Sequence, residues 1–450
     1  MRLLLGCAGI LISLAAGPTA AATGLANSPR FEELIRQGRA AFLASDPDRA
    51  DSAYQEACPA DAVAAYPVAD AVMCENLLAS VDETRGNLAR AEQRYREAAA
   101  HAEQAGGAYR PIYCVRLIDL GEYYHRRGRM SAAEQTLRNA ADLARQLTTT
   151  VPDLLPKALI RLGSLYADSS HPDRGRAPLT EALAMAKPVS LAPGEVAIAQ
   201  NALGKVELAC GHPLEAEPHL REAVAFAETT WGEDHPATAA YQTNLAMALI
   251  AERQLSRARL LLRRAQFVIE SKNRESKNRA SSLQLAAICA ELARIAASEG
   301  KMAEAEDYAM RSLSILHAQP EPHAAAVAAA KVTLSSVYIQ LHDLPSAASI
   351  LPEAIEVERQ TAVNPQTLAA SIQLLGQLRA EQRNWSAAEA LYREAAAIYG
   401  GGNAPVLLAL ANVLKQAGGS KQEIHHLEQQ AREISQADKR PGESRGPRGT

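Results

Sequence analysis

The chain has 450 residues and a formal net charge of −4, with 48% hydrophobic and only 4% aromatic residues. Nucleic-acid binding depends on an excess of Lys and Arg, so this charge excludes a global attraction to DNA or RNA. The scarcity of aromatic rings indicates a core built mainly from Leu and Ala.

Residues 1–22 differ from the rest of the chain and predict a secretory signal peptide. One basic residue, Arg2, precedes an apolar run from Leu3 to Gly17, and small residues follow up to Ala22. This order is typical of a cleaved export signal. We expect cleavage near Ala22, a periplasmic or secreted protein, and no membrane insertion after cleavage. The alternative is an uncleaved membrane anchor, although the apolar run is shorter than the roughly 20 residues that span a bilayer.

Between residues 30 and 434 one short pattern returns ten times, which makes this region a repeat array. In most copies a small anchor residue is followed by small residues 12 and 19 positions later and by a bulky apolar residue 16 positions later. These spacings lie on one helical face, and a Leu before nine anchors marks the buried stripe of a preceding helix. Each copy therefore predicts a helix hairpin, and the fold class is all-α. The anchors are Gly38, Ala79, Gly121, Gly163, Gly204, Ala246, Ala293, Ser335, Gly376 and Ala411.

A turn is expected between the two helices of each hairpin, seven residues after the anchor. A glycine there would close the first helix in the left-handed conformation. Five copies have this glycine, namely Gly86, Gly128, Gly211, Gly300 and Gly418. Other residues occupy the same position elsewhere, namely Ser170, Arg253, His342 and Arg383.

Two segments interrupt or end the array. The interval between Ala246 and Ala293 is five residues too long because residues 271–280 contain SKNRE and SKNRA in tandem. An insertion of this size predicts a solvent-exposed helix end or loop, and the functional alternative is a basic patch. The tail 437–450 is rich in Pro, Gly and Arg and predicts disorder.

Five cysteines remain after signal cleavage, so at least one is unpaired or pairs between chains. Cys58 is placed at the end of the first hairpin and Cys74 near the start of the next helix. Antiparallel neighbours bring these ends together, which makes a Cys58–Cys74 disulfide one interpretation. The other is that all five are small buried core residues.

The repeats resemble the tetratricopeptide repeat superfamily, in particular its long-period branch typified by kinesin light chains and many bacterial proteins. The stretch from Leu203 to Ala265 carries the resemblance best and includes the Gly-x-x-His-Pro connector at Gly232, His235 and Pro236. The resemblance covers about residues 30–434. It implies a right-handed superhelical solenoid of about ten antiparallel hairpins, whose concave groove binds a protein or peptide partner.

In this superfamily the first helix of each hairpin lines the groove. Asn and Gln there can bond the main chain of an extended peptide, while apolar residues accept its side chains. The alternative is that these polar residues form a hydrated surface that binds no ligand. Mapped onto this chain, the groove positions are Asn76, Glu83, His125, Arg161, Asn201, Lys205, Asn244, Met247, Arg294 and Gln373.

No motif indicates catalysis, a cofactor or a metal site. The histidines lack carboxylate or thiol ligands at zinc spacing, and no glycine-rich loop has the context of a phosphate site. We therefore expect a non-enzymatic exported scaffold that binds a protein or peptide and no nucleic acid. The alternatives are a self-assembling envelope protein and an accessory subunit of an envelope enzyme or secretion complex.

Overall fold

The computed structural model describes residues 29–43, 46–59, 66–275, 279–319, 323–361 and 364–437. The expected signal peptide and the centre of the duplicated linker lie outside these residues, as does the tail beyond Ala437. The chain divides into unit 1, Met1–Leu285, and unit 2, Ala286–Thr450, with the boundary inside one helix. Each unit is described by itself.

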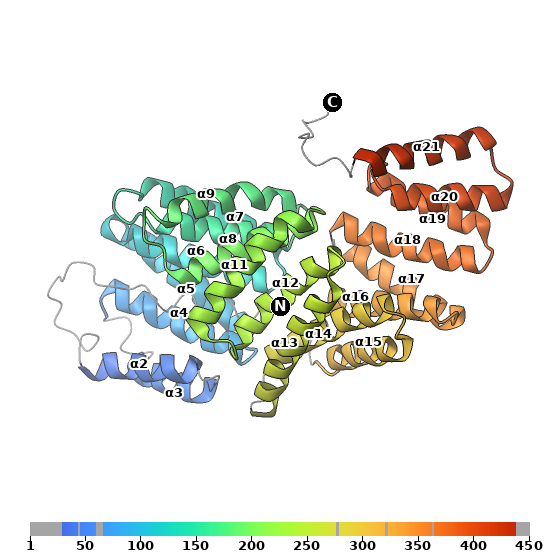
Figure 1. Ribbon diagram of the computed structural model, residues 1–450. Coiled ribbons are helices and arrows are strands. Elements are labelled where there is room, and N and C mark those ends of the chain that lie inside the picture. Colours follow the sequence, from blue (N-terminus) through green and yellow to red (C-terminus); the bar gives the residue numbers. More distant parts are fainter. Residues whose placement is uncertain are drawn as a thin grey trace. The chain divides into compact units, whose positions relative to one another are not determined.

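Unit 1 consists of consecutive antiparallel helix pairs, without strands in its described part (Figure 1). Its hairpins are α2–α3, α4–α5, α6–α7, α8–α9, α10–α11 and α12–α13. Short 3-10 turns at Gly107–Tyr109 and Pro172–Gly175 precede α6 and α9. The helices are α2 (Pro29–Leu43), α3 (Pro47–Ala57), α4 (Val68–Thr84), α5 (Leu88–Ala105), α6 (Arg110–Arg126), α7 (Met130–Gln146), α8 (Leu154–Ala167), α9 (Arg176–Ala186), α10 (Pro193–Ala209), α11 (Pro213–Trp231), α12 (Pro236–Ala251) and α13 (Leu255–Glu275).

Unit 2 continues the same architecture, with hairpins α16–α17, α18–α19 and α20–α21. Helix α14 (Arg279–Ser298) contains the boundary between the units. The remaining helices are α15 (Met302–His317), α16 (Ala324–Gln340), α17 (Leu344–Gln360), α18 (Pro365–Glu381), α19 (Trp385–Ile398), α20 (Ala404–Ala417) and α21 (Lys421–Ala437).

The anchor residues are small because the side chain 16 positions later fills the space beside them. A Cβ added to Gly204 would lie 2.4 Å from Cγ of Leu220 and 3.2 Å from the carbonyl oxygen of Ala216. The same arrangement pairs Gly163 with Leu179. The small anchor and the bulky residue 16 positions later thus form one contact. In it, the side chain of the second helix packs against the backbone of the first.

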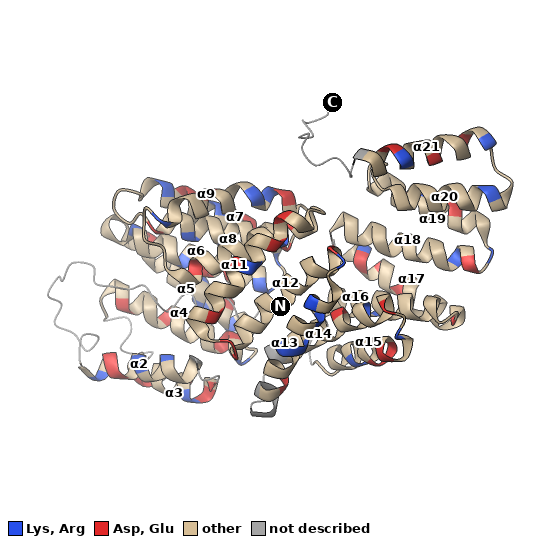
Figure 2. Ribbon diagram, in the orientation of Figure 1, with Lys and Arg blue, Asp and Glu red and all other residues tan. Residues whose placement is uncertain are grey.

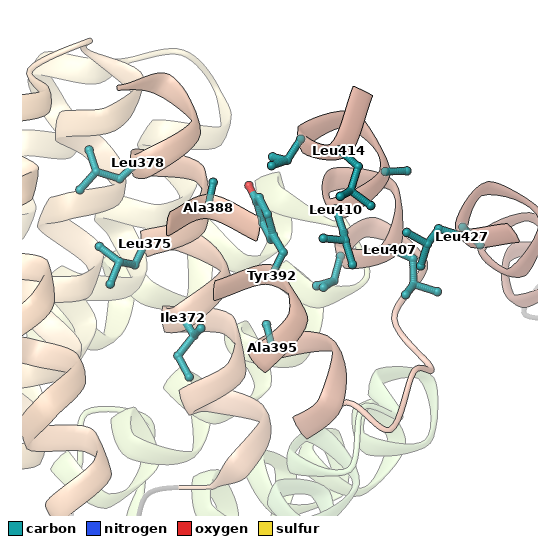
Figure 3. Close-up of a cluster of buried hydrophobic side chains, with 14 of the residues drawn as sticks. Ile372, Leu375, Leu378, Ala388, Tyr392, Ala395, Leu407, Leu410, Leu414 and Leu427 are labelled. Carbon is teal, nitrogen blue, oxygen red and sulfur yellow. The ribbon is translucent and has the colours of Figure 1, made fainter. Parts of the chain in front are cut away.

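The core of each hairpin consists of the residues that the repeat pattern marked as buried. The Ala columns 12 and 19 positions after the anchors are almost fully inaccessible to solvent, and so are the Leu residues before the anchors. Figure 3 shows this packing in unit 2, where Leu375, Tyr392 and Leu410 come from three successive helices. Burial of this aliphatic surface, at about 25 cal/mol per Å², is the main force that holds neighbouring hairpins together.

The turns follow the expected left-handed conformation, including three positions without glycine. Gly86, Gly128, Gly211, Gly300 and Gly418 all have φ between 72° and 83°. Arg253, His342 and Arg383 adopt the same conformation with φ of 63°, 59° and 58°. Ser170 is different, because its turn leads into the 3-10 helix Pro172–Gly175 and has no positive φ.

The five cysteines among the described residues divide into a disulfide-bonded pair and three others. Cys58, at the end of α3, and Cys74, on α4, form a disulfide with Cα atoms 5.7 Å apart. Cys114 and Cys289 are fully buried. Burial raises the pKa of Cys114 to about 12, so this thiol stays protonated and unreactive at neutral pH.

Candidate binding face

The first helices of the hairpins in unit 1 carry most of the residues expected to line a groove. These helices are α4, α6, α8, α10 and α12, and α8 packs against both α6 and α10. We call the expected groove residues on these helices, together with the charged side chains that pair with them, the first-helix face. Figure 2 shows basic and acidic residues interspersed along the helices of this unit.

A chain of five buried charged residues crosses four of these helices. Arg126 on α6 makes two hydrogen bonds to Glu83 on α4, of 2.7 and 2.8 Å. Arg161 on α8 bonds Glu122 on α6 and makes two bonds, of 2.7 and 2.9 Å, to Glu195 on α10. The five side chains are only 6–10% exposed. Glu83, Arg126, Glu122, Arg161 and Glu195 are called the ion-pair chain below.

Burial and pairing act against each other in the ion-pair chain. Burial raises the pKa of Glu122 despite the opposing effect of Arg161 and Arg126. Burial would lower the pKa of Arg161, but the carboxylates of Glu122 and Glu195 more than compensate and raise it. Arg161 therefore remains charged at all physiological pH values, and its loss would leave two buried carboxylates without their main partner.

A second ionic contact joins α6, α8 and α10 at the end of α8. Asp168 lies 2.5 Å from Nζ of Lys205 and 3.3 Å from Nε2 of His125. Burial would raise the pKa of Asp168, but Lys205 and His125 hold it well below its usual range. The sequence analysis placed His125 and Lys205 on the face but did not predict Asp168. In the structure, both basic side chains contact the Asp168 carboxylate.

The amide residues of the face are mostly buried. Nδ2 of Asn244 donates a 2.7 Å hydrogen bond to Oδ1 of Asn201, which joins α12 to α10. Asn76 on α4 lies beside Asp119 of α6 and is also buried. These side chains hold neighbouring hairpins in register. Met247, one turn beyond Asn244, is the most exposed member of the expected set in this unit, at 38%.

Two expected groove residues lie in unit 2. Arg294 on α14 is exposed and pairs with Glu291 of its own helix at 3.0 Å. Gln373 on α18 is half-buried. They are therefore not part of the first-helix face of unit 1.

Arg126, Asp168 and Glu195 are the charged residues that sequence reasoning missed. Arg126 and Asp168 stand five residues after their anchors and Glu195 stands nine before its anchor, so none of them occupies a groove position of the repeat. The signal that could have found them is charge complementarity between consecutive copies. Glu83 and Arg126 are 43 residues apart, and Arg161 and Glu195 are 34 apart.

The described residues hold neither a cluster of metal ligands nor a helix that could span a membrane. They contain no group of three or more His, Cys, Asp or Glu side chains placed to hold a metal ion. Among the same residues, no helix is both long and apolar enough to cross a bilayer.

Comparison with known families accounts for the helix hairpins. A family model described as tetratricopeptide repeat matches residues 71–146 and 195–266, which cover most of α4 to α7 and most of α10 to α13. The chain contains tetratricopeptide repeats. No curated protein matches the sequence. The fold is therefore an all-α tetratricopeptide array, as the repeat pattern predicted.

Two solved structures illustrate the likeness of fold. A Rap protein complexed with competence and sporulation factor is 13% identical, with a TM-score of 0.57 over 86% of this chain and 100% of that one. The apo form of RapI is 11% identical, with a TM-score of 0.51 over 82% of this chain and 97% of that one. At these identities the similarity shows the fold alone.

Proposed function

We propose that the protein is an exported, non-enzymatic scaffold that binds a peptide segment or protein partner on the first-helix face of unit 1. The observation that carries the proposal is the ion-pair chain with its flanking contacts. Together they tie α4, α6, α8, α10 and α12 into one preorganised surface. Rigid surfaces bind with less loss of conformational entropy than mobile ones.

The accessible part of this face suits an extended chain with mixed side chains. Lys205 on α10 and Met247 on α12 are its more exposed members. The hydrogen bond between Asn201 and Asn244 joins the same two helices. Asn201 and Asn244 are only 5% and 1% exposed, so their hydrogen bond orients the two helices. Lys205 and Met247 are the side chains that a ligand can reach.

Two considerations support export. Residues 1–22 have the order of a cleaved signal. The Cys58–Cys74 disulfide would persist in an oxidising compartment, whereas cytosolic thiols are kept reduced. The N-terminal residue of the protein recovered from cells tests this proposal. A mature chain that begins near residue 23 supports export with cleavage, and an intact Met1 contradicts it.

The resemblance in fold to a Rap protein that was solved with competence and sporulation factor agrees with a ligand-binding role, without naming a ligand. A photo-crosslinking residue at position 247 tests the face directly. Position 310 is the matched control, because Met310 is 48% exposed on α15 of unit 2. We expect protein adducts from 247 that are absent from 310.

The companion experiment replaces Lys205 by Ala and repeats the crosslinking at 247. Loss of most adducts with unchanged circular dichroism supports the binding face. Identical adducts from 247 and 310, or none from either, would contradict it. Adducts of the chain with itself alone would indicate self-association and replace the scaffold proposal.

A further inference from the structure

Unit 2 contains a cavity of about 300 Å³ between α15, α16 and α17. Most of the wall area is apolar, and the polar side chains that line the cavity are His317, Gln319, His323, Lys331 and Glu353. A volume of this size is at the lower end of small-molecule sites, which are typically apolar with a few polar groups. The apolar wall comes from Leu316, Val327, Ala328, Ala354 and Val357.

The first two turns of α16 read AAAVAAAK, and small side chains of this segment line the cavity. Eight residues before the anchor, Val327 stands where α8 has Leu155. Four before the anchor, Lys331 stands where α8 has Leu159 and α18 has Ile372, both fully buried, whereas α4, α10 and α12 have the polar residues Glu75, Gln200 and Gln242 there. In unit 2, a charged residue thus occupies a position that α18 uses for core packing.

Lys331 forms an ion pair with Glu353, a residue that is exposed to solvent. Its side chain is 15% exposed, and Nζ lies 2.8 Å from Oε2 of Glu353, whose side chain is 65% exposed. An ion pair with so exposed a carboxylate contributes little to stability. A ligand carboxylate could therefore replace Glu353 at Nζ with little loss to the fold, and its apolar part could fill the space left by the small side chains.

We propose that this cavity binds an apolar group that bears a carboxylate. Two sources share this chemistry: a free aliphatic carboxylic acid of about eight carbons, which such a volume holds, and the C-terminal apolar residue of another polypeptide. The proposal does not depend on the first-helix face, because the cavity and that face share no residue.

Octanoate and octanol, added to the full chain and followed by calorimetry, test the site. We expect octanoate to bind more tightly than octanol, because only octanoate can pair with Lys331. An N-acetylated pentapeptide that ends in Leu, with a free or amidated C-terminus, separates the two sources. Binding of octanoate alone identifies a free acid, and selective binding of the free-carboxylate peptide identifies a polypeptide C-terminus.

Three variants sharpen the test. Lys331→Met should weaken octanoate binding at least tenfold. The double variant Val327→Leu/Lys331→Leu gives α16 the side chains of α8, and should abolish binding and raise the melting temperature. Lys301→Met is the matched control, because Lys301 pairs with Glu299 at the same 2.8 Å but does not line the cavity. It should leave binding unchanged.

Three results would overturn the proposal. The first is no saturable binding of octanoate or of the free-carboxylate peptide at millimolar concentration. The second is equal affinity for octanoate and octanol together with no effect of Lys331→Met. The third is full binding by the filled double variant. Should the double variant fail to fold, Lys331→Met alone decides, because a single Met is compatible with the apolar wall.

Discussion

Replacement of Arg161 by Met should destabilise unit 1 far more than a typical surface substitution. Arg161 makes two hydrogen bonds to Glu195 and one ionic contact to Glu122, and all three side chains are almost fully buried. Removal of one partner from a buried ion pair costs about 3–5 kcal/mol, because the remaining charges stay desolvated without compensation. We expect a loss of this size in the free energy of unfolding at pH 7.

The pH dependence of this loss has a definite sign. Burial already raises the pKa of Glu122 above its unfolded value, so the folded state binds this proton more tightly than the unfolded state. The associated stability is present at low pH and is lost as the pH rises through the folded pKa. Without the cation of Arg161 the pKa of Glu122 rises further. The destabilisation should therefore be largest at pH 7 and smaller near pH 5.

Urea unfolding followed by circular dichroism measures this loss, and hydrogen exchange over α8 and α10 places it in unit 1. The triple variant Arg161→Met/Glu122→Gln/Glu195→Gln removes the unpaired charges and should return to within about 2 kcal/mol of the wild type. Arg221→Met is the control, since the Arg221 side chain is 57% exposed and pairs with Glu217 on the same helix. A loss below about 1 kcal/mol for Arg161→Met, or no recovery in the triple variant, would show that the buried carboxylates do not depend on Arg161.

Three further predictions concern stability. Reduction of the Cys58–Cys74 disulfide, or its replacement by two serines, should lower the stability of the first hairpins by about 3 kcal/mol, the value expected for a loop of this length. An unchanged melting curve with reductant would contradict this. Gly204→Ala should lower the free energy of unfolding in urea by about 1–2 kcal/mol, because the strain of a Cβ 2.4 Å from Leu220 exceeds the gain in helix propensity. A neutral result would show that the hairpin can widen freely. Three turns between the two helices of a hairpin are left-handed without glycine, and glycine at each should stabilise by about 0.5–1 kcal/mol in thermal melts. A lowered melting temperature would show that the native side chain contributes more than the strain. The positions are Arg253, His342 and Arg383.

Much of the fold could be predicted from the sequence, because the repeated residues are those that pack against each other within one hairpin. The anchor and the residue 16 positions later belong to the same hairpin, so their contact depends only on helix geometry and a short turn. Gly204 and Leu220 illustrate this, and so does Gly211 in the turn between their helices. One turn departs from the pattern, at Ser170, where a 3-10 helix intervenes.

The candidate site could be predicted only as a surface. The sequence placed Asn76, Asn201 and Asn244 on the first helices, but not their burial or the bond that joins the last two. Whether a polar side chain meets a ligand or a neighbouring helix depends on how two hairpins stack, and the spacing within one hairpin does not contain that information.

The sequence alone predicts the hairpin, its phase and the positions of its turns, because these follow from helical periodicity over about 42 residues. The pairing of the charges, the link that Arg161 makes to Glu122 and Glu195 across three hairpins, and the cavity beside Lys331 are visible only in the folded chain. These features join residues that are far apart along the chain. Contacts between side chains about 40 residues apart depend on the exact stacking of neighbouring hairpins, which local periodicity leaves open.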